Sequence, residues 1–178
     1  MENLKNKKLY KLVLSAMFVA VIAICSWISI PTTVPFTLQT LGIFIAAGLL
    51  GWKYGTLSVA VYILLGLVGV PVFANFSSGV GAIMGPTGGY IIGFLFTAVF
   101  LAATRGEKYN FKRYALLGCV VGIPLIYFFG FVQLKLVTGM PWDKAFMTGV
   151  LPFIPLDIVK CLGAAFLAGP IHRIFDHK

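Results

Sequence analysis

The chain has 178 residues, of which 60% are hydrophobic and 11% charged, and its net charge is +9. A soluble domain carries about 25% charged residues, and a chain this short has too little interior to hide so much apolar surface from water. These proportions exclude an ordinary soluble domain. They indicate an integral membrane protein, surrounded by the lipid bilayer and folded as a single domain over residues 1–178.

The positive charge lies at the ends of apolar segments. Most of the 14 Lys and Arg residues fall near the N-terminus, in short connectors at residues 51–55 and 105–113, or near the C-terminus. The positive-inside rule concentrates such residues on the cytoplasmic side of a membrane. The sequence has no water-soluble segment that could bind in a groove of DNA or RNA. We therefore do not expect nucleic acid as a partner.

The apolar segments predict about six crossings, since a membrane-spanning helix needs about 20 residues. In chain order they cover residues 9–30, 36–50, 56–70, 88–104, 114–137 and 155–175. The second and third are short and must be tilted or partly enclosed by protein. We therefore expect an all-α bundle of six transmembrane helices. An even number of crossings puts both basic termini on one side, the cytoplasm.

The connectors divide into two chemical kinds. Those assigned to the cytoplasm, residues 51–55 and 105–113, are short and basic, whereas residues 31–35, 71–87 and 138–149 are rich in Pro, Gly, Asn, Ser and Thr. Pro and Gly at this density break helices. Non-helical backbone at membrane depth is tolerated only where protein buries it or a wet cavity receives it. We therefore expect a structured pocket on the outer face.

Small residues recur at four-residue spacing within the expected spans, and such pairs let helices approach closely in lipid. The pairs are Ala16 with Ala20, Gly89 with Gly93, Ala98 with Ala102, Gly118 with Gly122, and Ala164 with Ala168. We expect most of them to pack inside one bundle. Any one pair could instead face a partner subunit, and periodicity does not distinguish these alternatives.

Asp157 and Lys160 form an ionisable pair at the start of the last expected span. Each charge inside a membrane costs about 2.5–3.5 kcal/mol on insertion scales, so such a pair is by default a functional-site hypothesis. Pro155 favours the first helical position, which puts Asp157 in the first turn and Lys160 a turn deeper. The structural alternative is that Asp157 caps the helix while Lys160 pairs with it or snorkels. We favour a ligand contact, because the pair faces the converging outer loops.

Further polar and aromatic residues gather at the same outer helix ends. A pocket with apolar walls and a few placed polar groups is what a small organic ligand requires. We expect five more residues to join the ionisable pair in a substrate-binding site, namely Phe36, Gln39, Thr40, Asn75 and Tyr90.

Signatures of catalysis and of metal binding are missing from the sequence. It has no GxxxxGKS/T phosphate-binding loop, so ATP hydrolysis by that machinery is excluded. Cys25, Cys119 and Cys161 are not at metal-ligand spacing, and His172 and His177 lie together at the C-terminal end. We therefore expect no enzyme activity, no catalytic residue, no metal and no cofactor.

Four segments taken together resemble the BioY family: PFTLQT at residues 35–40, GVPVFA at 69–74, GPTGGY at 85–90 and PFIPLDIVK at 152–160. The resemblance keeps the family's order and covers nearly the whole chain. One departure is Leu156, where family members often have glycine, although leucine fits a first helical turn. The resemblance implies a high-affinity biotin-binding S component of an energy-coupling-factor (ECF) vitamin importer in a prokaryotic cell membrane, with its site near the extracytoplasmic surface.

The resemblance also implies partners. Transport would require a transmembrane coupling (T) component and two cytoplasmic ATPases, and biotin would be the transported ligand. In the wider class a small-residue motif in the first helix docks the coupling protein, and Ala16 with Ala20 matches that pattern.

Biotin suits the chemistry of the expected site. Its carboxylate suits a lysine, its ureido N–H groups suit an aspartate, amides suit either end, and aromatic walls suit its ring. Which end meets which residue stays open, with a preference for Lys160 on the carboxylate. Two alternatives remain, an S component for another small vitamin and a self-sufficient secondary carrier. A carrier of that kind works by inverted repeats and ion coupling, and the two halves of this chain show no convincing repeat.

Overall fold

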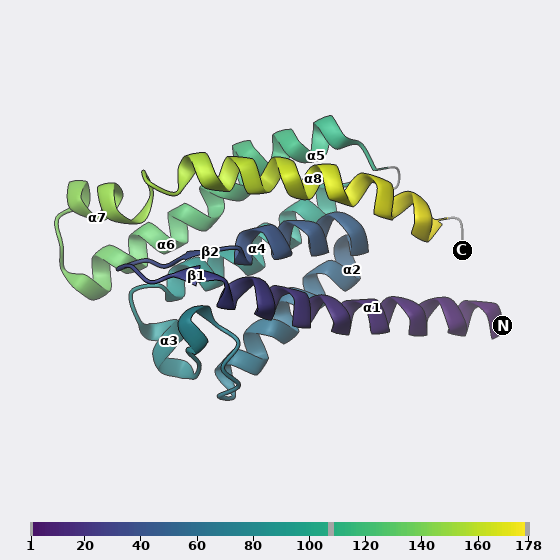
Figure 1. Ribbon diagram of the computed structural model, residues 1–178, viewed down its shortest axis with the longest axis horizontal. Coiled ribbons are helices and arrows are strands. Elements are labelled where there is room, and N and C mark those ends of the chain that lie inside the picture. Colours follow the sequence, from purple (N-terminus) through teal and green to yellow (C-terminus); the bar gives the residue numbers. More distant parts are fainter. Residues whose placement is uncertain (1, 107–108, 177–178) are drawn as a thin grey trace.

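The lysine-rich start and the following apolar run form one long helix, α1 (Glu2–Trp27), drawn in purple in Figure 1. The structure is a computed structural model that describes residues 2–106 and 109–176, with side chains described for 8–106 and 109–172. Beyond α1 the chain forms a small antiparallel hairpin of β1 (Ser29–Ile30) and β2 (Phe36–Thr37). Pro31 and Pro35 lie in its turn, where a helix could not continue. The end of the expected span 9–30 and the start of the expected span 36–50 were therefore wrong, because these residues form the hairpin.

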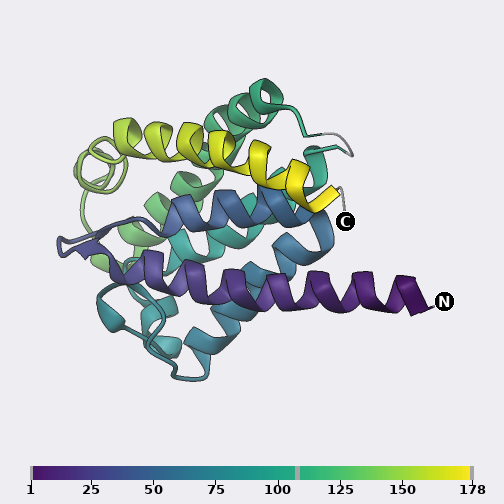
Figure 2. The same ribbon diagram turned by 45° about the vertical axis from the view of Figure 1, so that its right-hand side comes forward.

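The next helix, α2 (Gln39–Leu67), is bent sharply at Gly51, which has a φ of 71° and a ψ of −174°. Its two arms, residues 39–50 and 52–67, contact each other beside the bend. A Cβ on Gly55 would lie 2.9 Å from the Ala46 carbonyl oxygen, so only glycine fits there. Figures 1 and 2 show the chain running away from β2 and returning. These arms correspond to the expected second and third spans. The expected connector 51–55 is not a loop, because only Gly51 departs from helical geometry.

The segments after α2 contain short helices that the sequence did not predict. A single 3₁₀ turn, η1 (Ala74–Phe76), and α3 (Val80–Met84) precede α4 (Gly88–Thr104). Next, α5 (Phe111–Leu117), a π-helical turn η2 (Gly118–Gly122) and α6 (Ile123–Thr138) form one rod, Phe111–Thr138. The expected outer loop 138–149 contains α7 (Trp142–Gly149), and α8 (Ile154–Asp176) ends the described chain.

In the described part of the chain, four helices are long and apolar enough to cross a membrane: Lys8–Trp27, Gln39–Leu67, Phe111–Thr138 and Ile154–His172. Helix α4 is a shorter apolar helix. Large apolar side chains cover much of the outside, including Met17, Leu64, Phe128, Leu136 and Phe166. An apolar exterior suits lipid and not water. The fold is therefore all-helical apart from the hairpin, with several helices able to span a membrane.

Helix α2 lies at the centre of the bundle, where it contacts α1, α4 and α8, and α4 packs in turn against α6. Glycines permit the closest of these approaches. A Cβ on Gly89 would lie 2.1 Å from the Phe129 carbonyl oxygen, and one on Gly93 would lie 2.8 Å from the Ile126 Cα. The α4 and α6 backbones therefore touch, which is the packing expected of small residues at four-residue spacing.

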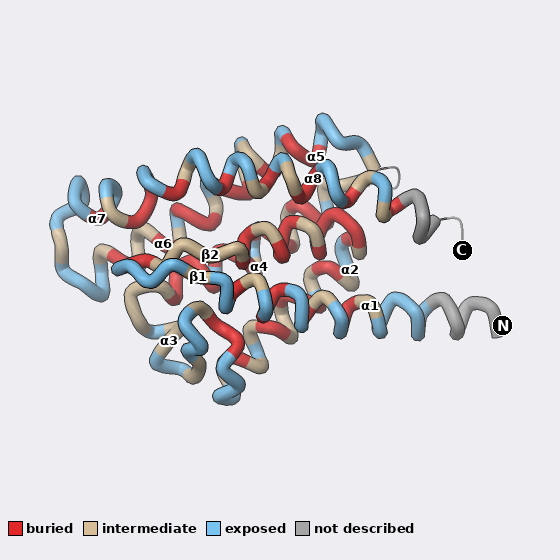
Figure 3. The backbone as a smooth tube through the Cα atoms, viewed as in Figure 1, coloured by how far each residue is buried: buried red, intermediate tan, exposed pale blue. Residues whose placement is uncertain are grey.

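The small-residue pairs fall into two groups. Four of the five pairs are buried, as expected for packing inside one bundle, whereas Ala16 and Ala20 are both exposed. In Figure 3 exposed turns recur along α1, although its neighbours in the bundle are mostly buried. Ala16 and Ala20 therefore lie on an exposed side of α1.

The two ends of the bundle differ in character. Helix α1 begins and α8 ends at one end of the molecule, whereas the hairpin, α3, α7 and the start of α8 lie at the opposite end (Figures 1 and 2). The Pro- and Gly-rich connectors thus gather around one end, as the sequence predicted.

Candidate ligand-binding site

A cavity of about 330 Å³ lies at the end of the bundle formed by the hairpin and the start of α8. Its walls come from the hairpin turn, the start of α2, the 73–77 segment, and helices α4, α6 and α8. Small-molecule pockets occupy about 300–1,000 Å³, so the cavity is large enough for one small organic ligand. The hydrophobic spans hold segments together here that are far apart in sequence.

The structure brings nearly all of the predicted site residues to this cavity. The lining includes Gln39, Thr40, Asn75, Tyr90, Asp157 and Lys160. Phe36 is not part of the lining. Its ring stacks on Phe153, with centroids 4.1 Å apart, and Phe153 faces the cavity. Phe36 therefore supports an aromatic wall from behind.

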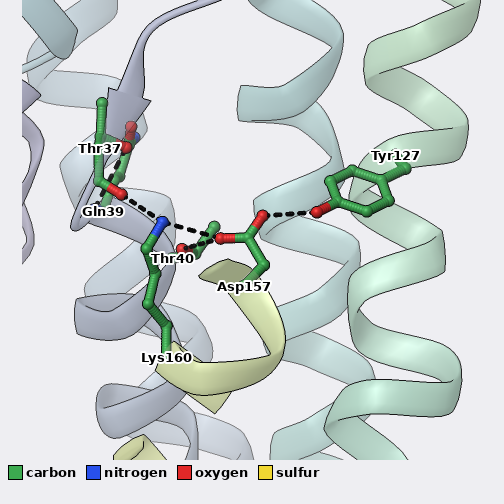
Figure 4. Close-up of polar contacts among 6 residues, drawn as sticks. All are labelled: Thr37, Gln39, Thr40, Tyr127, Asp157 and Lys160. Carbon is green, nitrogen blue, oxygen red and sulfur yellow. Dashed lines mark hydrogen bonds and ion pairs between the residues drawn. The ribbon is translucent and has the colours of Figure 1, made fainter. Parts of the chain in front are cut away.

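The carboxylate of Asp157 is the centre of the polar network shown in Figure 4. Its Oδ1 accepts from Lys160 Nζ at 2.9 Å and from Thr40 Oγ1 at 3.0 Å, and its Oδ2 accepts from the Tyr127 hydroxyl at 2.8 Å. Asp157 is only 4% exposed. A buried carboxylate is stable only when paired and hydrogen-bonded, and these three donors meet that need.

The start of α8 sets the positions of both charges. The Asp157 amide donates to the Phe153 carbonyl at 2.9 Å, which puts the carboxylate in the first helical turn, at the positive end of the helix dipole. Lys160 follows one turn later, and its Nζ also donates to the Thr37 carbonyl of β2 at 2.7 Å. An ammonium has three N–H donors, and two of them have acceptors among the described residues, so the third is available to a ligand. The pair is thus both internally bonded and part of the cavity wall.

Gln39 connects the cavity to the segment that follows α2. Its Nε2 donates to the Tyr62 hydroxyl at 2.7 Å, and this hydroxyl donates to the Val72 carbonyl at 3.0 Å. The Gln39 side-chain oxygen accepts no hydrogen bond from the described residues. Gln39 is therefore oriented with an acceptor available to a ligand.

Aromatic rings form much of the remaining wall. Phe73 and Phe94 join Phe153 and Tyr90 in the lining. The Tyr90 hydroxyl donates to the Gly149 carbonyl at 2.7 Å, so Tyr90 offers its ring to the cavity while its polar tip is already bonded. Phe73 is held where Gly66 leaves room, since a Cβ on Gly66 would lie 2.0 Å from its ring. These surfaces suit an apolar ring or chain.

Sequence reasoning missed Tyr127 and Phe153 as site residues, and the backbone carbonyl of Thr37. Tyr127 lies among apolar residues of the fifth expected span, and its hydroxyl is the only local feature that indicates a polar role. The sequence does not show which way this side chain points.

Among the described residues, no group of three or more His, Cys, Asp or Glu side chains could hold a metal ion.

Comparison with known proteins identifies the family of this chain. The model of the BioY family matches residues 1–177. The chain is 42% identical to the "Biotin transporter BioY" of Thermotoga maritima, covering 89% of this chain and 93% of that protein. It is also 42% identical to the "Probable biotin transporter BioY" of Pyrococcus horikoshii, covering 87% and 91% respectively.

A solved structure is similar over almost the whole fold. It is described as the S-component for biotin from an ECF-type ABC transporter, with a TM-score of 0.86, 30% sequence identity, and coverage of 94% of this chain and 93% of that one. Family motifs, overall identity and fold therefore agree, and the chain belongs to the BioY family.

Proposed function

We propose that this chain is the biotin-binding S component of an energy-coupling-factor importer. It captures biotin in the cavity at the extracytoplasmic end of the bundle and passes it to an ATP-driven coupling module. The observation that carries this proposal is the buried Asp157–Lys160 network on the cavity wall. The names of the relatives and of the similar solved structure support biotin as the ligand.

The cavity offers complementary groups for each part of biotin. The remaining N–H of Lys160 suits the carboxylate, and aromatic walls suit the thiophane ring and its tail. Asp157 Oδ2 accepts a single hydrogen bond from the described residues, so a further lone pair is available to a ureido N–H. The side-chain oxygen of Gln39 is a second acceptor for the same group. Thr40 acts through Asp157, to which its hydroxyl is bonded.

Calorimetry of the purified protein in detergent tests the ligand assignment. The parent should bind biotin tightly, and a second vitamin such as riboflavin should neither bind nor compete. Lys135→Ala is the matched lysine control, because Lys135 lies over the Trp142 ring, 5.3 Å from its centroid, and does not line the cavity. Tight binding of the other vitamin in place of biotin would contradict the assignment.

The proposed topology has six crossings, with each arm of α2 crossing once and both termini in the cytoplasm of a prokaryotic cell. Three observations support it. The arms of α2 fold back on one another, α1 begins and α8 ends at the same end of the bundle, and the cavity lies at the other end. The basic residues near both termini then obey the positive-inside rule.

The exposed strip of α1 is proposed as the docking surface for the transmembrane coupling component. Ala16 and Ala20 lie one helical turn apart and face outward, so a partner helix can approach the α1 backbone closely. The chain itself is proposed to be non-catalytic, with two partner ATPases in the cytoplasm supplying the energy. A self-sufficient carrier is disfavoured, because Asp157 is already neutralised by Lys160 and is not free to bind a coupling ion.

A further inference from the structure

The small hairpin lines the cavity with its turn and with Thr37, and it also contacts two other side chains of the cavity wall. Ser29 of β1 lies opposite Thr37 of β2. The Thr37 carbonyl accepts from Lys160 Nζ at 2.7 Å, while the Ser29 hydroxyl donates to Asn75 Oδ1 at 2.8 Å. One pair of facing hairpin residues therefore holds two cavity-lining side chains, Lys160 and Asn75, that come from distant parts of the chain.

Asn75 has an unusual backbone conformation. Its φ is 55° and that of Phe76 is 57°, both in the left-handed region, which asparagine tolerates but an aromatic residue seldom occupies. Neighbouring contacts stabilise this turn: Phe76 stacks on Trp27 with centroids 5.2 Å apart, and the Ser77 hydroxyl donates to the Ala74 carbonyl at 2.8 Å. These contacts fix the turn that carries Asn75 into the cavity lining.

The hydrogen bond from Ser29 determines which end of the Asn75 amide is available. Because the hydroxyl donates to Oδ1, the carbonyl end of the amide is occupied, and the NH₂ group is left without a partner among the described residues. A second acceptor for the hydroxyl, the Trp27 carbonyl, is more distant at 3.4 Å. Ser29 itself does not line the cavity, whereas Asn75 does.

We infer that Ser29 is a positioning residue for ligand recognition, which fixes the Asn75 amide as a hydrogen-bond donor toward an acceptor oxygen of the bound ligand. This inference rests on the proposed function, with biotin as the ligand and either its ureido or its carboxylate oxygen as the acceptor. Without the Ser29 hydroxyl, the amide rotates freely or flips its oxygen into the cavity. In a flipped amide, Asn75 Oδ1 would face the acceptor oxygen of the ligand, and two acceptors cannot form a hydrogen bond with each other.

A matched pair of substitutions tests the hydroxyl alone. Thr and Val have nearly the same shape, and both suit a strand. Ser29→Thr keeps the donor and should bind biotin within about threefold of the parent. Ser29→Val removes the donor and should bind about tenfold more weakly, which corresponds to about 1.4 kcal/mol, because one hydrogen bond and the alignment of the Asn75 amide are lost. Melting temperatures of the unliganded variants, measured in detergent, check that both fold.

A double-mutant cycle separates positioning from a general structural role. If Ser29 acts through the amide, Ser29→Val should weaken biotin binding no further in an Asn75→Ala background. Equal affinities for the Thr and Val variants would overturn the inference, and so would the same loss from Ser29→Val with and without the Asn75 amide. In both cases tight biotin binding by the parent keeps the proposed function standing. No biotin binding by the parent would overturn the proposed function and this inference with it.

Discussion

Removing the Lys160 charge is expected to reveal two separate roles of the pair that it forms with Asp157. In Lys160→Met, the carboxylate, only 4% exposed, keeps the hydroxyls of Thr40 and Tyr127 but loses its counter-charge. Breaking a buried ion pair in this way costs about 3–5 kcal/mol. For a chain of this length, a loss of that size lowers the melting temperature by roughly 6–20 °C.

Adding Asp157→Asn to Lys160→Met should restore most of that stability. An amide carries no charge, its oxygen still accepts from Thr40, and its NH₂ can donate to the Tyr127 oxygen. Replacing a buried ion pair by neutral groups is often neutral for stability. Biotin binding should stay weak in the double variant, because loss of a desolvated polar contact costs about 2–5 kcal/mol, or at least roughly 30-fold in affinity.

Thermal melting without ligand and calorimetry with biotin, both in detergent, measure the two effects on the same proteins. Lys135→Met is the control for loss of a lysine outside the cavity. A stable double variant that binds biotin within about threefold of the parent would show that the pair only stabilises the fold. That result would refute its assignment to the ligand site.

Three further predictions concern the outside and the packing of the bundle. Replacing both Ala16 and Ala20 with Trp should leave biotin affinity and melting temperature unchanged, because both are exposed, but should abolish pull-down of the coupling component and ATP-driven uptake. In a cysteine-free background, an impermeant thiol reagent added outside cells should label Gly81→Cys and not Lys112→Cys, both at exposed positions. Gly55→Ala should destabilise the protein by about 1–3 kcal/mol, since its Cβ would lie 2.9 Å from a backbone oxygen of the other α2 arm, whereas Gly81→Ala has open space and should not.

Each of these expectations has a clear contrary result. Normal assembly and uptake in a stable Trp double variant would remove the α1 strip as the docking surface. Labelling of Lys112→Cys from outside, with Gly81→Cys protected, would invert the topology. A Gly55→Ala protein as stable as the parent would mean that the arms of α2 do not touch at the bend.

Hydropathy and local residue types in the sequence were sufficient for several features. The membrane class, the approximate spans and the clustering of Pro- and Gly-rich connectors depend on segment composition, which does not require knowledge of packing. The placement of Asp157 and Lys160 one turn apart at the start of the last helix is likewise local, because Pro155 favours the first helical turn. The BioY family, shown by the family-model match over residues 1–177, could also be inferred from four sequence motifs.

The tertiary structure decided which side chains meet, because that depends on which face of each helix turns inward. Ala16 with Ala20 has the same spacing as the buried pairs, yet only packing shows that it faces outward. Tyr127 is one aromatic among several in its span until α6 turns its hydroxyl onto Asp157. Phe36 lies behind Phe153, and the direction of the Asn75 amide follows from Ser29, many residues away. A short sequence motif encodes the residue types at such positions, whereas the orientation of each group is set by contacts between distant segments.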